Sequence, residues 1–168
     1  MARRIFYSFH FDGDYWRTQQ VRNIGALEHD EPVSKNDWEE VKQRGDQAIE
    51  NWIAAQLGDK SCLVCLIGTE TSSRPWVIHE IQEAWNAGKG VVGIHIHNLR
   101  DSSQKQSAKG TNPFTKLHFV RSPSKLLSSV ANVYDLGSTD SQVTYQWIAN
   151  HLEAAVEEAI AIRDRFTL

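Results

Sequence analysis

Two uninterrupted apolar runs and one amphipathic segment organise the chain. Residues 61–67 and 90–97 are apolar stretches of strand length, a pattern typical of strands buried on both faces of a sheet. Residues 4–11 are rich in aromatic side chains and predict another strand near the start. Near the end, apolar residues recur at helical spacing opposite a glutamate-rich face, which predicts an amphipathic helix over about residues 143–166.

Polar segments between the strands predict the remaining helices. Turn residues 12–14 can cap a helix over about residues 15–27. A capping-box pattern followed by helical apolar spacing predicts one continuous helix over about residues 36–57. A third helix is expected over about residues 74–87, with Ser73 as its N-cap and a proline in its first turn.

Strands that alternate with helices indicate an α/β fold. We expect a flavodoxin-like three-layer sandwich, with a mostly parallel sheet covered by helices on both faces, formed by a single domain over residues 1–168. Ligands of such sheets bind beyond the carboxyl ends of the strands. Segments 8–14, 68–80 and 96–114 should therefore meet at the ligand-binding edge. The polar stretch that follows the 90–97 run predicts a long loop, and short strands are expected near residues 118–120 and 133–134.

Composition narrows the functional classes. The 168 residues carry a net charge of −3, so no strongly basic field indicates nucleic acid as a partner. No run approaches the roughly 18 apolar residues of a membrane span, and the first residues do not form a signal peptide, so we expect a cytoplasmic protein with no membrane partner. Glycine-rich phosphate-binding motifs and the G-x-S-x-G elbow are absent from the sequence.

The cysteines, two of the histidines and one glutamate could bind a metal or a substrate, but their sequence context favours structural roles. Cys62 and Cys65 lie within an apolar run and are predicted to be core residues. His95 and His97 alternate along a strand and so share a side, where hydrogen-bonded, partly buried imidazoles are favoured over a metal pair. Glu70 is expected to cap the next helix, with substrate binding as the alternative. No metal ligand is assigned.

Trp76 and Glu80 are the most informative pair of polar-edge residues. They are four residues apart on the predicted helix, so they share one face, while apolar residues define another face. The helix begins at the expected ligand-binding edge. There an indole can stack on a planar ring, and a carboxylate can stabilise positive charge. From the spacing alone, a solvated glutamate beside a half-buried tryptophan is the more common arrangement.

Five separated segments carry a further signal. They are Phe6-Tyr7-Ser8-Phe9-His10, Ile67-Gly68-Thr69-Glu70-Thr71, Trp76-Val77-Ile78-His79-Glu80-Ile81, Gly93-Ile94-His95-Ile96 and Asn112-Pro113-Phe114. In this order they resemble the bacterial TIR-like family that includes the TIR protein of the Thoeris antiphage system. The resemblance spans roughly residues 3–115 and implies a TIR-like fold.

The resemblance also implies a function. Thoeris TIR proteins sense phage infection and convert NAD⁺ into a cyclic ADP-ribose isomer, a diffusible messenger that activates a separate effector. Carried over by position, Glu80 would be the catalytic residue. The substrate-binding residues would be Ser8, Phe9, His10, Trp38 and Trp76. Trp38 is included because residues 28–38 replace the loop that usually follows the second TIR strand.

Two functional readings remain open at the level of sequence. In the first, the protein is an enzyme that uses NAD⁺ as substrate and needs no cofactor, and it could act as a homo-oligomer. In the second, it is a non-catalytic TIR-like module that binds a partner or senses a phage component, because a fold does not fix a function. The joint presence of Trp76 and Glu80 favours the enzyme.

Overall fold

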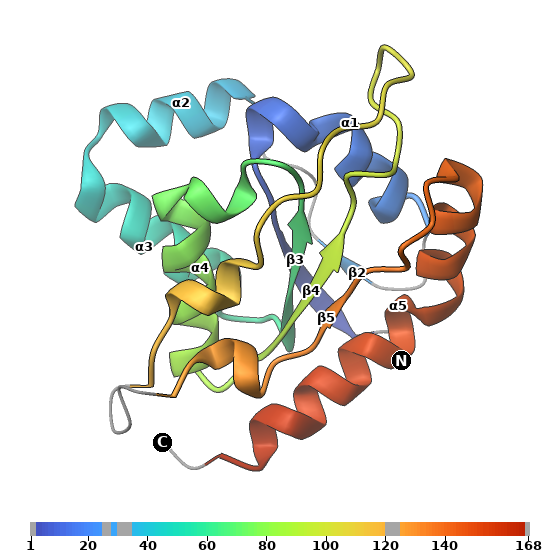
Figure 1. Cartoon of the computed structure of the whole chain (residues 1–168). Helices are drawn as coiled ribbons and strands as arrows, with labels where there is room; N and C mark the ends of the chain where they lie inside the picture. Colours follow the sequence, from blue (N-terminus) through green and yellow to red (C-terminus); the bar gives the residue numbers. More distant parts are fainter. Residues whose placement is uncertain (1–2, 25–27, 30–34, 120–124, 167–168) are drawn as a thin grey trace.

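Five strands form the centre of the molecule in the spatial order β2-β1-β3-β4-β5 (Figure 1). They are β1 (Arg4–Ser8), β2 (Glu28–His29), β3 (Cys62–Ile67), β4 (Gly90–His95) and β5 (Val133–Tyr134). All four pairings are parallel. The computed structural model describes residues 3–24, 28–29, 35–119 and 125–166, with only the backbone described at 28–29 and 35–38.

The central strands are buried on both faces, as their apolar runs predict. Every residue of β3 and β4 is buried, and β3 pairs with β1 on one side and β4 on the other. Cys62 and Cys65 are free, fully buried thiols whose pKa is raised by burial. Their assignment as core residues is confirmed.

Helices cover both faces of the sheet. α1 (Phe11–Arg22) and α5 (Ser141–Asp164) lie on one face, and α3 (Asp46–Leu57) and α4 (Pro75–Asn86) lie on the other (Figure 1). Even-numbered residues of β3 and β4 pack toward α5, and odd-numbered residues pack toward α3 and α4. The result is the predicted α/β, flavodoxin-like three-layer sandwich. Across the described residues, no helix has the length and apolar character needed to cross a bilayer.

Two helix predictions need correction. α1 begins at Phe11 rather than near residue 15, because the backbone N–H of Asp14 already bonds to the His10 carbonyl at 2.9 Å. The predicted continuous helix over 36–57 is two helices, α2 (Lys35–Gln43) and α3, which are separated at Gly45. Gly45 has φ +95° and ψ 175°, a conformation that glycine alone adopts readily.

The start of α4 also differs from the prediction. A short 3-10 turn, η1 (Thr71–Ser73), precedes it, and Arg74 rather than Ser73 is the N-cap residue. The Ser73 hydroxyl instead donates to the Glu70 carbonyl at 2.8 Å. Glu70 does not cap the helix either, since its carboxylate accepts a hydrogen bond from Arg74 at 2.9 Å. Pro75 lies at the first helical position, as predicted.

The last third of the chain follows its predicted outline with changes in detail. The loop after β4 ends in a 3-10 turn, η2 (Pro113–Lys116), and an isolated antiparallel bridge joins His118 to Leu126 before η3 (Leu127–Ser129). β5 occupies the predicted positions. α5 starts two residues earlier than predicted, because the Asp140 side chain accepts from the backbone N–H groups of Gln142 and Val143, and it ends at Asp164, two residues before the predicted end.

Candidate active site

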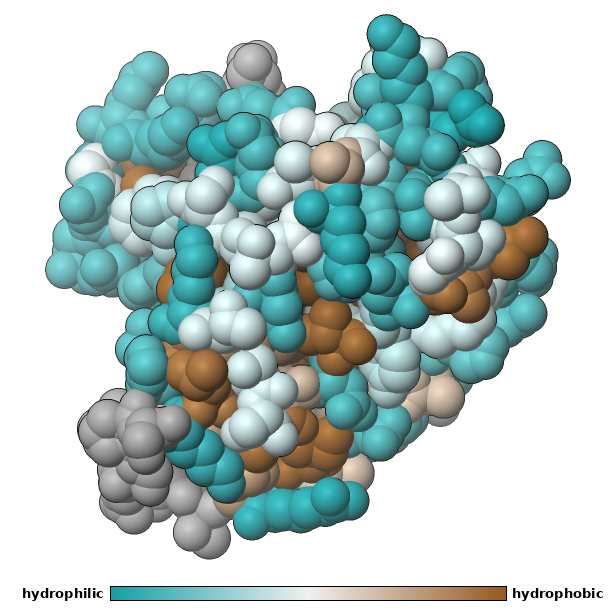
Figure 2. Space-filling view, in the orientation of Figure 1, coloured by the Kyte–Doolittle hydropathy of each residue, from teal (hydrophilic) through white to brown (hydrophobic). Residues whose placement is uncertain are grey.

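The carboxyl ends of β1, β3 and β4 lie at one edge of the sheet, at the top of Figure 1, and the segments that follow them are in contact. The Thr69 hydroxyl, after β3, donates to the Ala108 carbonyl, in the loop after β4, at 2.5 Å. Figure 2 shows that the surface along this upper edge is largely hydrophilic. The polar edge where ligands of such sheets bind is therefore formed by the segments that the sequence indicated.

Glu80 projects from α4 toward the end of β1. Val77, Ile81 and Ala84 form the buried face of α4, and Glu80 lies off that face, partly buried. The hydroxyl of Ser8, the last residue of β1 and 1% exposed, donates to Glu80 Oε1 at 3.4 Å. This contact joins two of the predicted site residues across 72 positions of the sequence.

The surroundings of Glu80 change its acidity. Burial raises the pKa of Glu80 to about 8, and the hydrogen bond from Ser8 opposes part of that rise. Cys65 is the β3 residue paired with Ser8, and its pKa is raised by burial and, to a smaller extent, by the charge of Glu80. A carboxyl group with this pKa is mostly protonated at neutral pH in the free protein, and a cation bound nearby would favour its ionised form.

Trp76 lies one helical turn before Glu80. Its ring is partly buried against the apolar cluster between α3, α4 and the sheet. The ring also meets the imidazole of His79 edge to face, with centroids 5.5 Å apart and planes at 80°. His79, to which the sequence assigned no role, therefore helps to fix the Trp76 ring.

The other predicted substrate-binding residues do not all join Glu80. Phe9 packs toward the opposite face of the sheet, against the cluster under α5, and stacks on Phe11 with centroids 6.0 Å apart. His10 Nδ1 lies 3.8 Å from Glu70 Oε2. Trp38 belongs to α2, but its side chain lies outside the described part of the structure, so its role stays a prediction.

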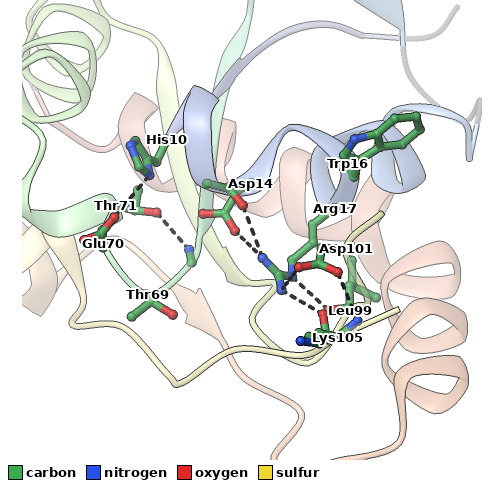
Figure 3. Close-up of polar contacts among 12 residues, drawn as sticks. His10, Asp14, Trp16, Arg17, Thr69, Glu70, Thr71, Leu99, Asp101 and Lys105 are labelled. Carbon is green, nitrogen blue, oxygen red and sulfur yellow. Dashed lines mark hydrogen bonds and ion pairs between the residues drawn. The ribbon is translucent and has the colours of Figure 1, made fainter. Parts of the chain in front are cut away.

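A buried ion pair at this edge was missed by the sequence reasoning. Asp14 and Arg17, one turn apart on α1, are both buried, and Arg17 Nη1 donates to Asp14 Oδ1 at 3.0 Å (Figure 3). Burial raises the pKa of Asp14, while Arg17 acts to lower it. The signal was the i, i+3 spacing of an acid and a base, which was hidden by assigning Asp14 to a turn before the helix.

His95 and His97 share one side, as predicted, and their rings meet edge to face with centroids 5.6 Å apart. Burial lowers the pKa of His95 to about 4 and lowers that of His97 as well. The expected hydrogen bond is missing at Nδ1 of each ring, which has no partner among the described residues. Within the same part of the chain, no three His, Cys, Asp or Glu side chains are placed to hold a metal ion.

Comparison with known proteins finds a family model and a relative that each match more than half of the chain. Residues 6–101 match the family model of the Thoeris protein ThsB, TIR-like domain. A Bacillus cereus (strain MSX-D12) protein named "Putative cyclic ADP-D-ribose synthase ThsB1" is 33% identical over 124 residues, which cover 71% of this chain and 65% of the relative. The chain thus spans somewhat less than two thirds of that relative's length. This chain belongs to the TIR-like domain family of the Thoeris protein ThsB.

Proposed function

We propose that this protein cleaves the nicotinamide–ribose bond of NAD⁺ and forms a cyclic ADP-ribose-type messenger that activates a partner effector, with Glu80 as the catalytic residue. Membership of the ThsB family and the name of the Bacillus cereus relative support this class of reaction. The observation that carries the proposal is the position of Glu80, which is partly buried at the carboxyl ends of the strands and hydrogen-bonded to Ser8.

The chemistry needs one well-placed carboxylate. When the bond between ribose C1′ and the nicotinamide nitrogen breaks, its electron pair leaves with nicotinamide, and positive charge develops on the ribose. An ionised Glu80 next to C1′ would stabilise that charge. Cyclisation then requires that a second nucleophile of the same molecule, rather than water, is held next to C1′.

The raised pKa of Glu80 fits a site that binds a cationic substrate. In the free protein, burial keeps much of Glu80 protonated near neutral pH. The positively charged nicotinamide ring of NAD⁺ would favour loss of that proton, and the Ser8 hydroxyl would remain as a donor to the resulting carboxylate. Substrate binding itself would then produce the ionised form that the reaction uses.

The remaining substrate contacts are proposed from their positions. Trp76, whose ring orientation is fixed by His79, would flank the nicotinamide ring. His10 would contact the substrate from the end of β1, where it lies near Glu70. Phe9 would act indirectly, by packing under β1 and α1.

Mass spectrometry of nucleotides from phage-infected cells tests the proposal. Wild-type protein should yield an ADP-ribose derivative, and Glu80→Gln should lower its amount by about 100-fold or more. Glu83→Gln, which removes a carboxylate three residues further along α4, should yield the wild-type amount.

Two results would contradict this account. Equal product from wild type and Glu80→Gln would remove Glu80 from the catalytic role. Absence of any ADP-ribose derivative in cells that the wild-type protein defends would instead support a non-catalytic binding module.

A further inference from the structure

The guanidinium group of Arg17 links α1 to the long loop after β4. Arg17 is 4% exposed, and its side chain donates to the Leu99 carbonyl at 2.8 Å and to the Lys105 carbonyl at 2.9 Å (Figure 3). Asp101 Oδ2 lies 3.8 Å from the same group. The neighbouring Trp16 points away from this cluster and is 57% exposed, so Arg17 marks the inward side of α1 (Figure 3).

Asp14 carries the link on to the turn between β3 and α4. A Cβ atom placed on Gly68 would lie 1.9 Å from Asp14 Oδ2, so the carboxylate rests directly on the backbone of Gly68. A Cβ atom on Gly110 would lie 2.0 Å from the Gly68 carbonyl oxygen. Gly68 is therefore enclosed by Asp14 on one side and by the returning loop on the other.

We infer that the buried Asp14–Arg17 pair is the positioning element of the candidate active site, because it fixes the loop over residues 98–112 against the turn that leads into α4. This inference rests on the proposed function. The pair does not touch the Glu80 carboxylate in any described contact. It acts through Gly68 and the loop, which set the shape of the edge that a dinucleotide would cross.

A charged pair suits this task better than apolar packing. The loop segment 99–105 has no strand or helix to satisfy its carbonyl groups, so an arginine with several donors in a fixed plane can hold two of them at once. Asp101 stabilises the turn over residues 101–105, since its Oδ1 accepts from the backbone N–H groups of Ser103 and Lys105. Buried ion pairs add little to stability on balance, which favours a role in geometry.

Amide hydrogen exchange of the purified protein tests the positioning directly. Arg17→Lys keeps the charge but cannot reach both carbonyls with one planar group, so exchange over residues 99–105 should become about tenfold faster. The matched control is Arg163→Lys. Arg163 is 3% exposed and donates to the carbonyls of Trp85 and Phe166, both at 2.9 Å. The control variant therefore also lacks a buried arginine that binds two carbonyl groups.

The control should leave exchange over residues 99–105 at the wild-type rate. Equal acceleration in both variants would show general loosening of the fold, and no acceleration in Arg17→Lys would show that the loop holds itself. Either result overturns the inference. If Arg17→Lys does not fold, Asp14→Asn keeps the shape against Gly68 and gives the same readout, with the same expected direction.

Kinetics with NAD⁺ separate positioning from general damage. Arg17→Lys should raise KM for NAD⁺ by about tenfold and leave kcat within about threefold, because it disturbs the edge that binds substrate and leaves Glu80 in place. Thr69→Val, which removes the bond to Ala108 at the other end of the loop, should shift KM in the same direction.

The two proposals fail in different ways. A fall in kcat with unchanged KM in Arg17→Lys would contradict the positioning role while leaving Glu80 as the catalytic residue. A wild-type protein that makes no product would contradict the proposed function, and the exchange measurement would still test whether Arg17 holds the loop.

Discussion

At the scale of single residues, Glu80 owes its properties to where α4 places it. It lies off the apolar face of the helix but is partly buried next to Ser8 at the end of β1, so its carboxyl group loses part of its contact with water. Burial of this kind disfavours the charged form. The same enclosure that suits a charge-stabilising role thus costs the free protein stability whenever Glu80 is ionised.

This cost predicts a pH dependence of stability. Between pH about 4.5 and about 8 the folded protein retains a proton on Glu80 that the unfolded chain has released, so Glu80 lowers the stability as pH rises through that window. Glu80→Gln removes this effect. The unfolding free energy of the variant, relative to that of wild type, should rise from pH 5 to pH 8 by at most about 1.4 kcal/mol per pH unit. The Tm of the variant relative to wild type should rise over the same range.

Thermal unfolding of wild type, Glu80→Gln and Glu83→Gln at several pH values gives the measurement. Glu83→Gln is the control for loss of a carboxylate from α4, and the Glu80→Gln difference from wild type should change with pH more steeply than the Glu83→Gln difference. A Glu80→Gln difference that does not change between pH 5 and pH 8 would mean that the Glu80 carboxyl group titrates as in water.

Sequence predicted some site residues at this scale and missed others for definite reasons. Helical spacing placed Glu80 off the core face of α4, and family resemblance placed Ser8 near it; both positions agree with the structure. Phe9 was grouped with Ser8, although consecutive strand residues point to opposite faces. Arg17 was missed because its partners are backbone carbonyls of a loop more than 80 residues away, which no local pattern records.

At the scale of elements, backbone conformation at single glycines decides where helices end. Apolar residues continue at helical spacing from α2 into α3, so the sequence pattern predicted one helix where there are two. The break is at Gly45, whose positive φ lies in a region that other residues avoid. Hydrophobic periodicity reports which face is buried, and it does not report a change of direction between two helices that bury similar faces.

Gly45→Ala should therefore destabilise the protein by about 1–3 kcal/mol through backbone strain alone, since a Cβ at this position would meet no other atom within 4 Å. Gly58, at the other end of α3, provides the control. It has φ −53° and ordinary contact distances for a Cβ, so Gly58→Ala should be neutral or stabilising by up to about 1 kcal/mol.

Urea unfolding of the two variants checks this prediction. Similar changes in stability for both would show that the α2–α3 junction tolerates a conformation other than the one in the structure, and that Gly45 does not determine the break.

At the scale of the whole molecule, the arrangement of layers could be predicted and the way they fit together could not. Two fully apolar runs indicated the central strands, and the alternation with helices indicated a parallel sheet. The close approach of α5 to β4 depends on Gly90, where a Cβ would lie 2.8 Å from the backbone of Ala159. The meeting of Gly68 with Gly110 is similar. Such fits bring a glycine against the backbone of a segment far along the chain, so a single sequence does not reveal them.

We propose that NAD⁺ lies across the carboxyl ends of β1, β3 and β4, with its nicotinamide ribose at Glu80. A crystal structure of the protein with a non-cleavable carbocyclic analogue of NAD⁺ would show where the dinucleotide binds. The account predicts that the carbon equivalent to C1′ lies about 3–4 Å from the Glu80 carboxylate. An analogue bound at another face of the molecule, or with that carbon far from Glu80, would contradict it.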